Sequence, residues 1–422
     1  MSALLVTPML PWNLSQDRHG VFQRMGLMLE AAKGAFGAVT VLLVVPIGTR
    51  PEPDYLEKLE NIRRWMAADL GQGFKVELLA YEPAEPSWLA KLPRADWYFG
   101  PRPLPLASPG SVGRLDKIVA DCRPVTIVAH RLLAFGLARQ SSAARSIPIV
   151  LDLDDVEHVA HARQVLMPPV WRSKRLRLIH CASLLAEELR ALARCRQVYL
   201  CSARDTRRFG WIDLGRRLRV VPNTIADPYG GCRPPQAPDA PRVLYVGALT
   251  YAPNRAGLQW FVESIWPQLL ARSPGVRLTI VGQGSRDFSV PETVAESIDL
   301  LGFVEDLAPI YAASSVVVCP LLAGGGTRIK IIEAAAHGRP VVSTTIGAEG
   351  LDFVGGESIV LADSPGDFSR RLADILAASD DVRRIGSNAR RVFLEKYERR
   401  MALDLLSGML AQVASEATGP AS

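Results

Sequence analysis

The sequence predicts an α/β protein with two Rossmann-like domains facing a cleft, and three observations support this. With 422 residues, of which 48% are hydrophobic, the chain is long enough to bury two cores. Short β-branched runs alternate with longer helical patterns in two consecutive series, which is typical of parallel sheets covered by helices. A stretch rich in Gly and Pro, residues 229–241, lies between the two series and is the clearest candidate for a linker.

The first series predicts six buried parallel strands with helices between them. Strands are expected at residues 3–7, 38–45, 75–79, 125–130, 147–153 and 197–202, and helices, for example, at 20–33 and 54–69. The N-terminal apolar run has no basic region before it, so it is interpreted as a first strand rather than a signal peptide. No run of about 18 uncharged apolar residues occurs, and no transmembrane helix is expected.

The second series begins directly after the Gly/Pro-rich stretch. Strands are expected at 242–246, 277–281, 298–301 and 316–319, with helices at 255–271 and 307–313. A final helix is expected at 392–414. The predicted domains are therefore residues 1–232 and residues 241–391, followed by a C-terminal segment at 392–422.

The most informative segment is GGGTRIKIIEAAAHGRPVV, residues 324–342. Glycines close a loop ahead of an apolar-periodic helix, whose buried face holds Ile329, Ile332 and Ala336. Backbone N–H groups at such a helix start suit a phosphate or diphosphate, and a carboxylate two turns on can reach sugar hydroxyls. The residues assigned to this ligand are Gly324, Gly325, Gly326, Thr327, Arg328, Lys330 and Glu333. The alternative is a tight turn with glycines for packing, but flanking cations and one acidic residue are hard to explain as packing.

This pattern resembles the donor site of retaining glycosyltransferases with the two-domain GT-B fold, the family-four (glycosyltransferase group 1) type. Those proteins usually carry a Glu-x7-Glu motif here. Glu333 matches the second Glu, whereas Gly325 occupies the first position. The GGGTR-IK-hydrophobic-E version is similar to a bacterial branch found in exopolysaccharide and natural-product glycosylation. The resemblance also implies that the final helix crosses back to the first domain.

Three further glycine turns match the family in order. Gly247 follows the first strand of the second series and would approach the diphosphate, at the edge where open α/β sheets bind ligands. Relatives often place an Arg and a Lys in this loop, but here Ala248 and Asn254 stand there, with Arg255 next. The counter-ion role therefore moves to Arg328 and Lys330. The other two turns are formed by Gly282 and by the expected base-binding residues Gly302, Phe303 and Val304.

The N-terminal half is less specific. The resemblance implies that the first loop, residues 8–20, approaches the sugar and acceptor, with Gly20 giving a close backbone contact. His130 ends a predicted strand and is a catalytic candidate beside the transferred sugar, together with Glu333. A structural role for His130 is the alternative.

A second alternative concerns Asp152, Asp154, Asp155 and Glu157, which follow or end a strand. A D-x-D at a strand end is used by haloacid-dehalogenase-type phosphatases around Mg²⁺, and paired carboxylates also bind metal in GT-A transferases. The recognised branch often carries a similar acidic stretch, so these residues fit without a metal. They are expected to face the acceptor or to hold the end of the strand.

The resemblance implies transfer of a hexosyl unit from a nucleotide-sugar with retention of the anomeric configuration. No cofactor beyond the donor co-substrate and no metal are expected, because cations and the helix dipole would stabilise the departing phosphate. A non-catalytic nucleotide-sugar-binding protein, which Gly325 favours, and a GT-B sugar-nucleotide epimerase are the alternatives. The candidate acceptors are a lipid-linked compound and a natural product.

Composition bears on location and partners. Six scattered cysteines without a C-x-x-C pair favour a reducing compartment and no structural zinc, so a cytoplasmic protein is expected. Residues 1–240 hold 32 Lys+Arg against 23 Asp+Glu, and residues 241–422 hold 17 against 20. The basic first half, densest around Arg172, Lys174, Arg175 and Arg177, is consistent with peripheral membrane contact at the inner face or with a solvated helix surface. No aromatic platform or DNA-binding motif accompanies the arginines, so nucleic acid is not an expected partner.

Overall fold

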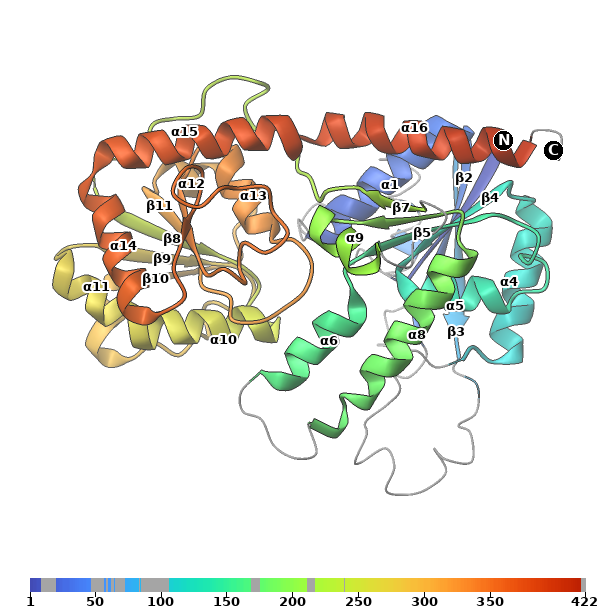
Figure 1. Ribbon diagram of the computed structural model, residues 1–422, viewed down its shortest axis with the longest axis horizontal. Helices are drawn as coiled ribbons and strands as arrows, with labels where there is room; N and C mark the ends of the chain where they lie inside the picture. Colours follow the sequence, from blue (N-terminus) through green and yellow to red (C-terminus); the bar gives the residue numbers. More distant parts are fainter. Residues whose placement is uncertain are drawn as a thin grey trace. The chain divides into compact units, whose positions relative to one another are not determined.

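The computed structural model describes residues 1–8, 20–46, 57, 60, 61, 64, 73–82, 84, 106–167, 175–210, 217–238 and 240–418. The chain forms two compact units. The first unit contains Met1–Pro222 and Arg400–Ser422, and the second contains Asn223–Arg399 (Figure 1). Of the expected helix at 54–69, four residues are described and all four are helical.

The first unit is built on a parallel sheet with the strand order β3-β2-β1-β4-β5-β6-β7. Parallel strands buried on both faces need apolar residues at nearly every position, which is what the β-branched runs supply. The strands are β1 (Ser2–Thr7), β2 (Ala38–Pro46), β3 (Phe74–Tyr81), β4 (Thr126–His130), β5 (Ile149–Asp154), β6 (Gln197–Leu200) and β7 (Leu218–Val220).

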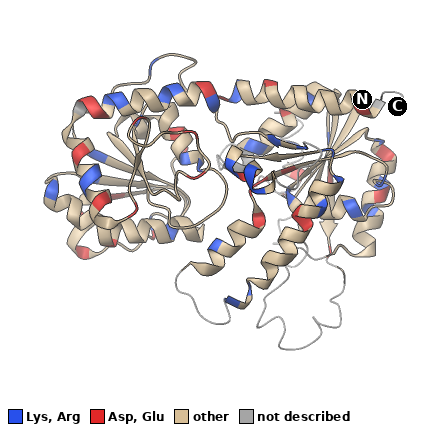
Figure 2. Ribbon diagram, viewed as in Figure 1, with Lys and Arg blue, Asp and Glu red and all other residues tan. Residues whose placement is uncertain are grey.

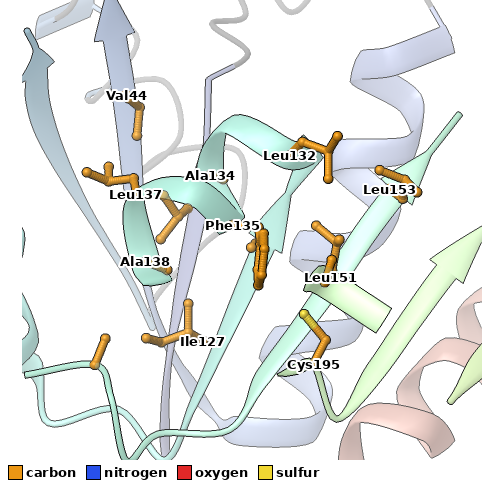
Figure 3. Close-up of a cluster of buried hydrophobic side chains, with 14 of the residues drawn as sticks. Val44, Ile127, Leu132, Ala134, Phe135, Leu137, Ala138, Leu151, Leu153 and Cys195 are labelled. Atoms are coloured by element: carbon orange, nitrogen blue, oxygen red, sulfur yellow. The ribbon is translucent and has the colours of Figure 1, made fainter. Parts of the chain in front are cut away.

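Helices cover this sheet and form two buried clusters. In the cluster shown in Figure 3, Leu132, Phe135 and their neighbours from α5 pack against Ile127 and Leu151 of the sheet. In the other, Leu406 and Leu410 of α16 pack with residues of α1 and β1, so the C-terminal helix completes the core of the first unit. The helices are α1 (Gly20–Phe36), α4 (Pro109–Cys122), α5 (Arg131–Gln140), α6 (Glu157–Leu166), α8 (Ile179–Arg194), α9 (Ala203–Phe209) and α16 (Arg399–Thr418).

The second unit has its own parallel sheet, with the order β10-β9-β8-β11-β12-β13. The strands are β8 (Arg242–Val246), β9 (Arg277–Val281), β10 (Ile298–Gly302), β11 (Val316–Cys319), β12 (Val341–Ser343) and β13 (Val360–Leu361). The helices include α12 (Ala308–Ala312), α13 (Ile329–Ala336), α14 (Pro365–Ala377) and α15 (Ser379–Lys396). The prediction of two Rossmann-like domains is confirmed.

The helix expected at 255–271 contains a π-helical turn. It consists of α10 (Ala252–Trp260), the π segment Phe261–Ile265 and α11 (Trp266–Arg272). Pro267 has no N–H to donate and its ring displaces the carbonyl one turn earlier. The N–H of Trp266 donates to the oxygen of Phe261, five residues earlier. This π-helical hydrogen bond lets the helix continue through the proline.

The Gly/Pro-rich stretch at 229–241 is not a free linker, and this corrects the prediction. It belongs to the second unit, whose first residue is Asn223. Arg390 pairs with Asp227 at 2.7 Å and donates to the Cys232 oxygen at 3.2 Å, while buried Arg339 donates to the Pro235 oxygen at 2.9 Å. Gly and Pro exclude regular secondary structure, but they do not exclude tertiary contacts.

The C-terminal helix also differs from the expected range of 392–414. Two helices, α15 and α16, replace it, with a break at Tyr397 and Glu398. At the break, the Ile225 N–H donates to the Tyr397 oxygen at 3.3 Å and the Arg399 N–H donates to the Ile225 oxygen at 3.0 Å. These long-range hydrogen bonds engage the Tyr397 oxygen and the Arg399 N–H, which would otherwise form the hydrogen bonds of a continuous helix.

Candidate functional site

Three predicted glycine turns meet at the carboxyl edge of the second sheet. The Gly247 N–H, after β8, donates to the Val281 oxygen at 2.9 Å, and the Gly282 N–H donates to the Gly302 oxygen at 2.8 Å. A Cβ on Gly282 would lie 2.2 Å from the Gly247 oxygen, so glycine is required there. The three turns therefore form one hydrogen-bonded surface at the edge where parallel sheets bind ligands.

The start of α13 lies at the same edge. Gly324 and Gly326, in the loop before it, have φ angles of 127° and 65°, which side-chain-bearing residues adopt rarely. Arg328 precedes the first helical residue and its side chain makes no capping bond to the helix. The first N–H groups of a helix have no intrahelical acceptor, so this end of α13 can bind an anion. Ile329, expected on the buried face, is only partly buried, whereas Ile332 and Ala336 are fully buried.

Lys330 connects α13 to the turn after β8. Its Nζ donates to Asn254 Oδ1 at 3.0 Å and lies 4.6 Å from the ring centre of Tyr245. A Cβ on Gly247 would lie 2.7 Å from this Nζ, so the ammonium group contacts the turn directly. Burial lowers the pKa of Lys330 to about 8, because few opposite charges compensate for its lost hydration.

Arg328 lies beside the glycine loop, and only part of its guanidinium group is hydrogen-bonded. Its Nη1 donates to the oxygens of Gly325 and Gly326. Its Nε and Nη2 atoms are buried and have no hydrogen-bond partner in the part of the chain that the structure describes. A Cβ on Gly324 would lie 3.1 Å from Nη2, which places this donor beside the loop. Buried donors without a partner are costly, and an anion at the loop would satisfy them.

Glu333 lies one turn beyond Lys330 and is held by a residue that the sequence reasoning missed. The Tyr311 hydroxyl donates to Glu333 Oε2 at 3.0 Å. The Tyr311 ring stacks on His337 with 4.3 Å between centres, and His337 Nδ1 lies 2.8 Å from the Tyr229 hydroxyl. No sequence signal could have shown this, because Tyr311 lies in a different helix and reaches Glu333 only in the fold.

The other predicted donor-side residues lie around this edge. Phe303 is exposed and Val304 is partly buried, directly after the Gly302 turn. Thr327 is buried, and its hydroxyl accepts a hydrogen bond from Asn223 at 3.0 Å. Arg255 is exposed, with its Nε donating to the Leu249 oxygen at 3.4 Å.

His130 and Gly20 belong to the first unit. His130 ends β4 and is 2% exposed, with Nδ1 2.9 Å from the Thr7 hydroxyl. Its Nε2 is buried and has no partner among the described residues. Burial lowers the pKa of His130 to about 4, so the ring is neutral at neutral pH. Gly20 begins α1, and residues 9–19 of the predicted first loop lie outside the described residues.

Two carboxylates of the acidic stretch at the end of β5 are paired with arginines. Asp152 and Arg24 form a fully buried ion pair at 2.6 Å, and Asp154 pairs with Arg131 at 2.8 Å. Carboxylates already paired with arginines are not open to Mg²⁺, so the phosphatase interpretation loses its support. Nowhere in the described ranges do three or more His, Cys, Asp or Glu side chains gather in a way that could hold a metal ion.

Comparison with known proteins finds a family match within the second unit. Residues 240–378 match the family model of glycosyl transferases group 1. A 132-residue segment is 30% identical to D-inositol 3-phosphate glycosyltransferase of Segniliparus rotundus, and it covers 28% of this chain and 29% of that protein. The matched segments span less than half the length of the curated relatives.

Solved structures resemble the whole chain. Sucrose-phosphate synthase from Thermosynechococcus elongatus has a TM-score of 0.66 at 17% identity, covering 98% of this chain and 99% of that one. Anabaena Alr3699/HepE, solved in complex with UDP, has a TM-score of 0.63 at 16% identity, covering 97% and 99%. The chain thus shares the two-domain GT-B fold of these structures, and residues 240–378 of its second unit match the glycosyl transferases group 1 model.

Proposed function

We propose that this protein is a glycosyltransferase that moves a hexosyl unit from a nucleotide-sugar to an acceptor. The observation that carries the proposal is the anion-binding arrangement around α13. Unpartnered donors of Arg328 lie at the glycine loop before the start of α13. The ammonium group of Lys330, from the first turn of that helix, contacts the neighbouring Gly247 turn. Structures of Anabaena HepE in complex with UDP and with UDP-glucose support a nucleoside diphosphate as the ligand here.

The diphosphate would occupy the loop at 324–328, and Phe303 and Val304 would lie beside the base. Glu333 would accept hydrogen bonds from the ribose hydroxyls, since Tyr311 fixes the orientation of its carboxylate. As the glycosidic bond to the donor phosphate breaks, negative charge develops on the departing oxygen. Lys330, Arg328 and the positive end of α13 would stabilise that charge most in the transition state.

Retention of configuration and independence from divalent metal are further parts of the proposal. Arg328 and Lys330 would neutralise the diphosphate in place of Mg²⁺. Turnover is therefore expected to continue in EDTA, and the product anomer, followed by NMR, should match the donor anomer. Loss of turnover in EDTA with recovery in Mg²⁺ would contradict metal independence.

Calorimetry with UDP, GDP and TDP tests the site directly. Gly326→Val should sharply weaken binding of the preferred diphosphate, because valine disfavours the φ of 65° that shapes the loop. Gly356→Val is the matched control, since Gly356 also lies in the second unit at a φ of 81° and a Cβ there has nothing within 4 Å. Equal affinities in the two folded variants would refute the assignment.

A non-catalytic nucleotide-sugar-binding protein is the second candidate, and Gly325 in place of the first Glu of the motif favours it. One experiment, which measures consumption of the donor, distinguishes the two functions. The enzyme consumes the donor, by transfer or slow hydrolysis, at a rate that Lys330→Met lowers. The binding protein would bind UDP-sugar without releasing UDP.

A further inference from the structure

The helices α6 and α8 present an apolar patch at one end. The two helices pack side by side in the first unit, with the ring centres of His161 and His180 6.0 Å apart (Figure 1). Near the end of α6 and the start of α8, Leu166, Leu176 and Ile179 are 51%, 37% and 61% exposed. The inner faces are already packed, because Val165 and Leu184 are buried. Packing against the described residues of the unit therefore does not explain the three exposed side chains.

The described charged residues at the same end of the two helices are cationic. Residues 158–186 contain five Lys and Arg and no Asp or Glu. Arg175 and Arg177 are exposed, and neither forms an ion pair with any residue that the structure describes. The nearest acids along the chain, Glu157 and Glu187, lie away from this end, and Glu187 is engaged by two arginines. Figure 2 shows Lys and Arg without Asp or Glu at this end.

We propose that this end of the α6–α8 pair docks on an anionic lipid bilayer. The docking patch is defined as Leu166, Arg175, Leu176, Arg177 and Ile179. Aliphatic side chains flanked by arginines match the interface of a membrane, where the apolar groups enter the acyl boundary and the cations bind lipid phosphates. The start of α8 adds the positive end of its dipole.

Charge complementarity selects this partner over others. A protein partner would need acidic side chains arranged against each arginine, whereas an anionic leaflet presents its charge evenly over any small basic patch. No described helix is long and apolar enough to cross a membrane. The docking patch would contact the surface of the bilayer.

Flotation of the full chain with vesicles tests the proposal. Vesicles of phosphatidylcholine with one third phosphatidylglycerol should bind the wild type at low salt, and vesicles of phosphatidylcholine alone should not. Arg175→Glu/Arg177→Glu should lower binding at least tenfold, since each basic residue near an anionic surface contributes about fivefold. Leu176→Ser/Ile179→Ser should lower it about tenfold through lost apolar burial.

Two control variants make the same kinds of substitution outside the docking patch. Arg194→Glu makes the same charge reversal at the opposite end of α8, about 22 Å from its start. Met401→Ser removes another exposed apolar side chain from the first unit. Both variants should bind vesicles like the wild type, and unchanged circular dichroism of every variant would exclude misfolding.

Three results would overturn the proposal: a wild type that ignores anionic vesicles, docking-patch variants that still bind, or an Arg194→Glu variant that loses binding equally. The docking patch lies in the first unit and does not depend on the nucleotide site. Calorimetry with UDP on the same variants should show unchanged affinity, so failure of membrane docking and failure of the proposed function are distinguishable.

Discussion

Replacing Lys330 tests whether its ammonium group binds the donor diphosphate. The charge lies beside the Gly247 turn and is held by Asn254. A charged hydrogen bond contributes about 1.5–3 kcal/mol, so Lys330→Met should weaken UDP binding roughly tenfold to a hundredfold at pH 7. The fold should survive, because methionine fills similar space and carries no charge to desolvate.

The lowered pKa makes the prediction sharper. With a pKa of about 8, Lys330 in the free protein is about nine-tenths protonated at pH 7 and about one-tenth at pH 9. Only the charged form binds the diphosphate well, so the dissociation constant for UDP should rise about tenfold between these values. The terminal phosphate of UDP is already ionised throughout this range and does not contribute.

Calorimetry at pH 7, 8 and 9 measures this dependence, and Lys330→Met serves as its own control. The variant has no group titrating near pH 8 at this position, so its affinity should stay nearly constant from pH 7 to 9. A wild type with equal affinity at both ends of the range, or a variant with the same slope as the wild type, would refute the role of Lys330.

The remaining predictions concern polar groups that are buried or partly buried. Arg24→Met should lower the free energy of unfolding by about 3–5 kcal/mol, because it leaves Asp152 buried without its partner, while Arg24→Met/Asp152→Leu should recover much of the loss in urea titrations. The folded-state pKa of His130, about 4, lies below the unfolded value of 6.5, so stability should fall by about 3 kcal/mol as pH drops from 7 to 4. His130→Gln should reduce that dependence, and an equal loss in the variant would show that other groups cause it. Glu333→Ala should abolish the preference for UDP over 2′-deoxy-UDP, which we expect to be about 1–3 kcal/mol, and Tyr311→Phe should reduce it; unchanged discrimination would remove the ribose role.

The sequence by itself determined most of the strands, the glycine turns and the glycine loop before α13, although β7 and β13 were not predicted. These features depend on neighbours in the chain. A β-branched run favours a buried strand. Glycine permits the positive φ angles of Gly282 and Gly324 in any tertiary context. The family pattern around Glu333 is likewise a local string of residues. Each could therefore be placed before the fold was known.

Only the tertiary structure decided which side chains complete the site and where the units divide. Tyr311 reaches Glu333, Asn254 orients Lys330, and Arg24 neutralises Asp152 across 128 positions of the chain. The break between α15 and α16 follows from hydrogen bonds to Ile225, far earlier in the sequence. Contacts of this kind depend on how distant elements pack, and that information is not contained in the periodicity of any single segment.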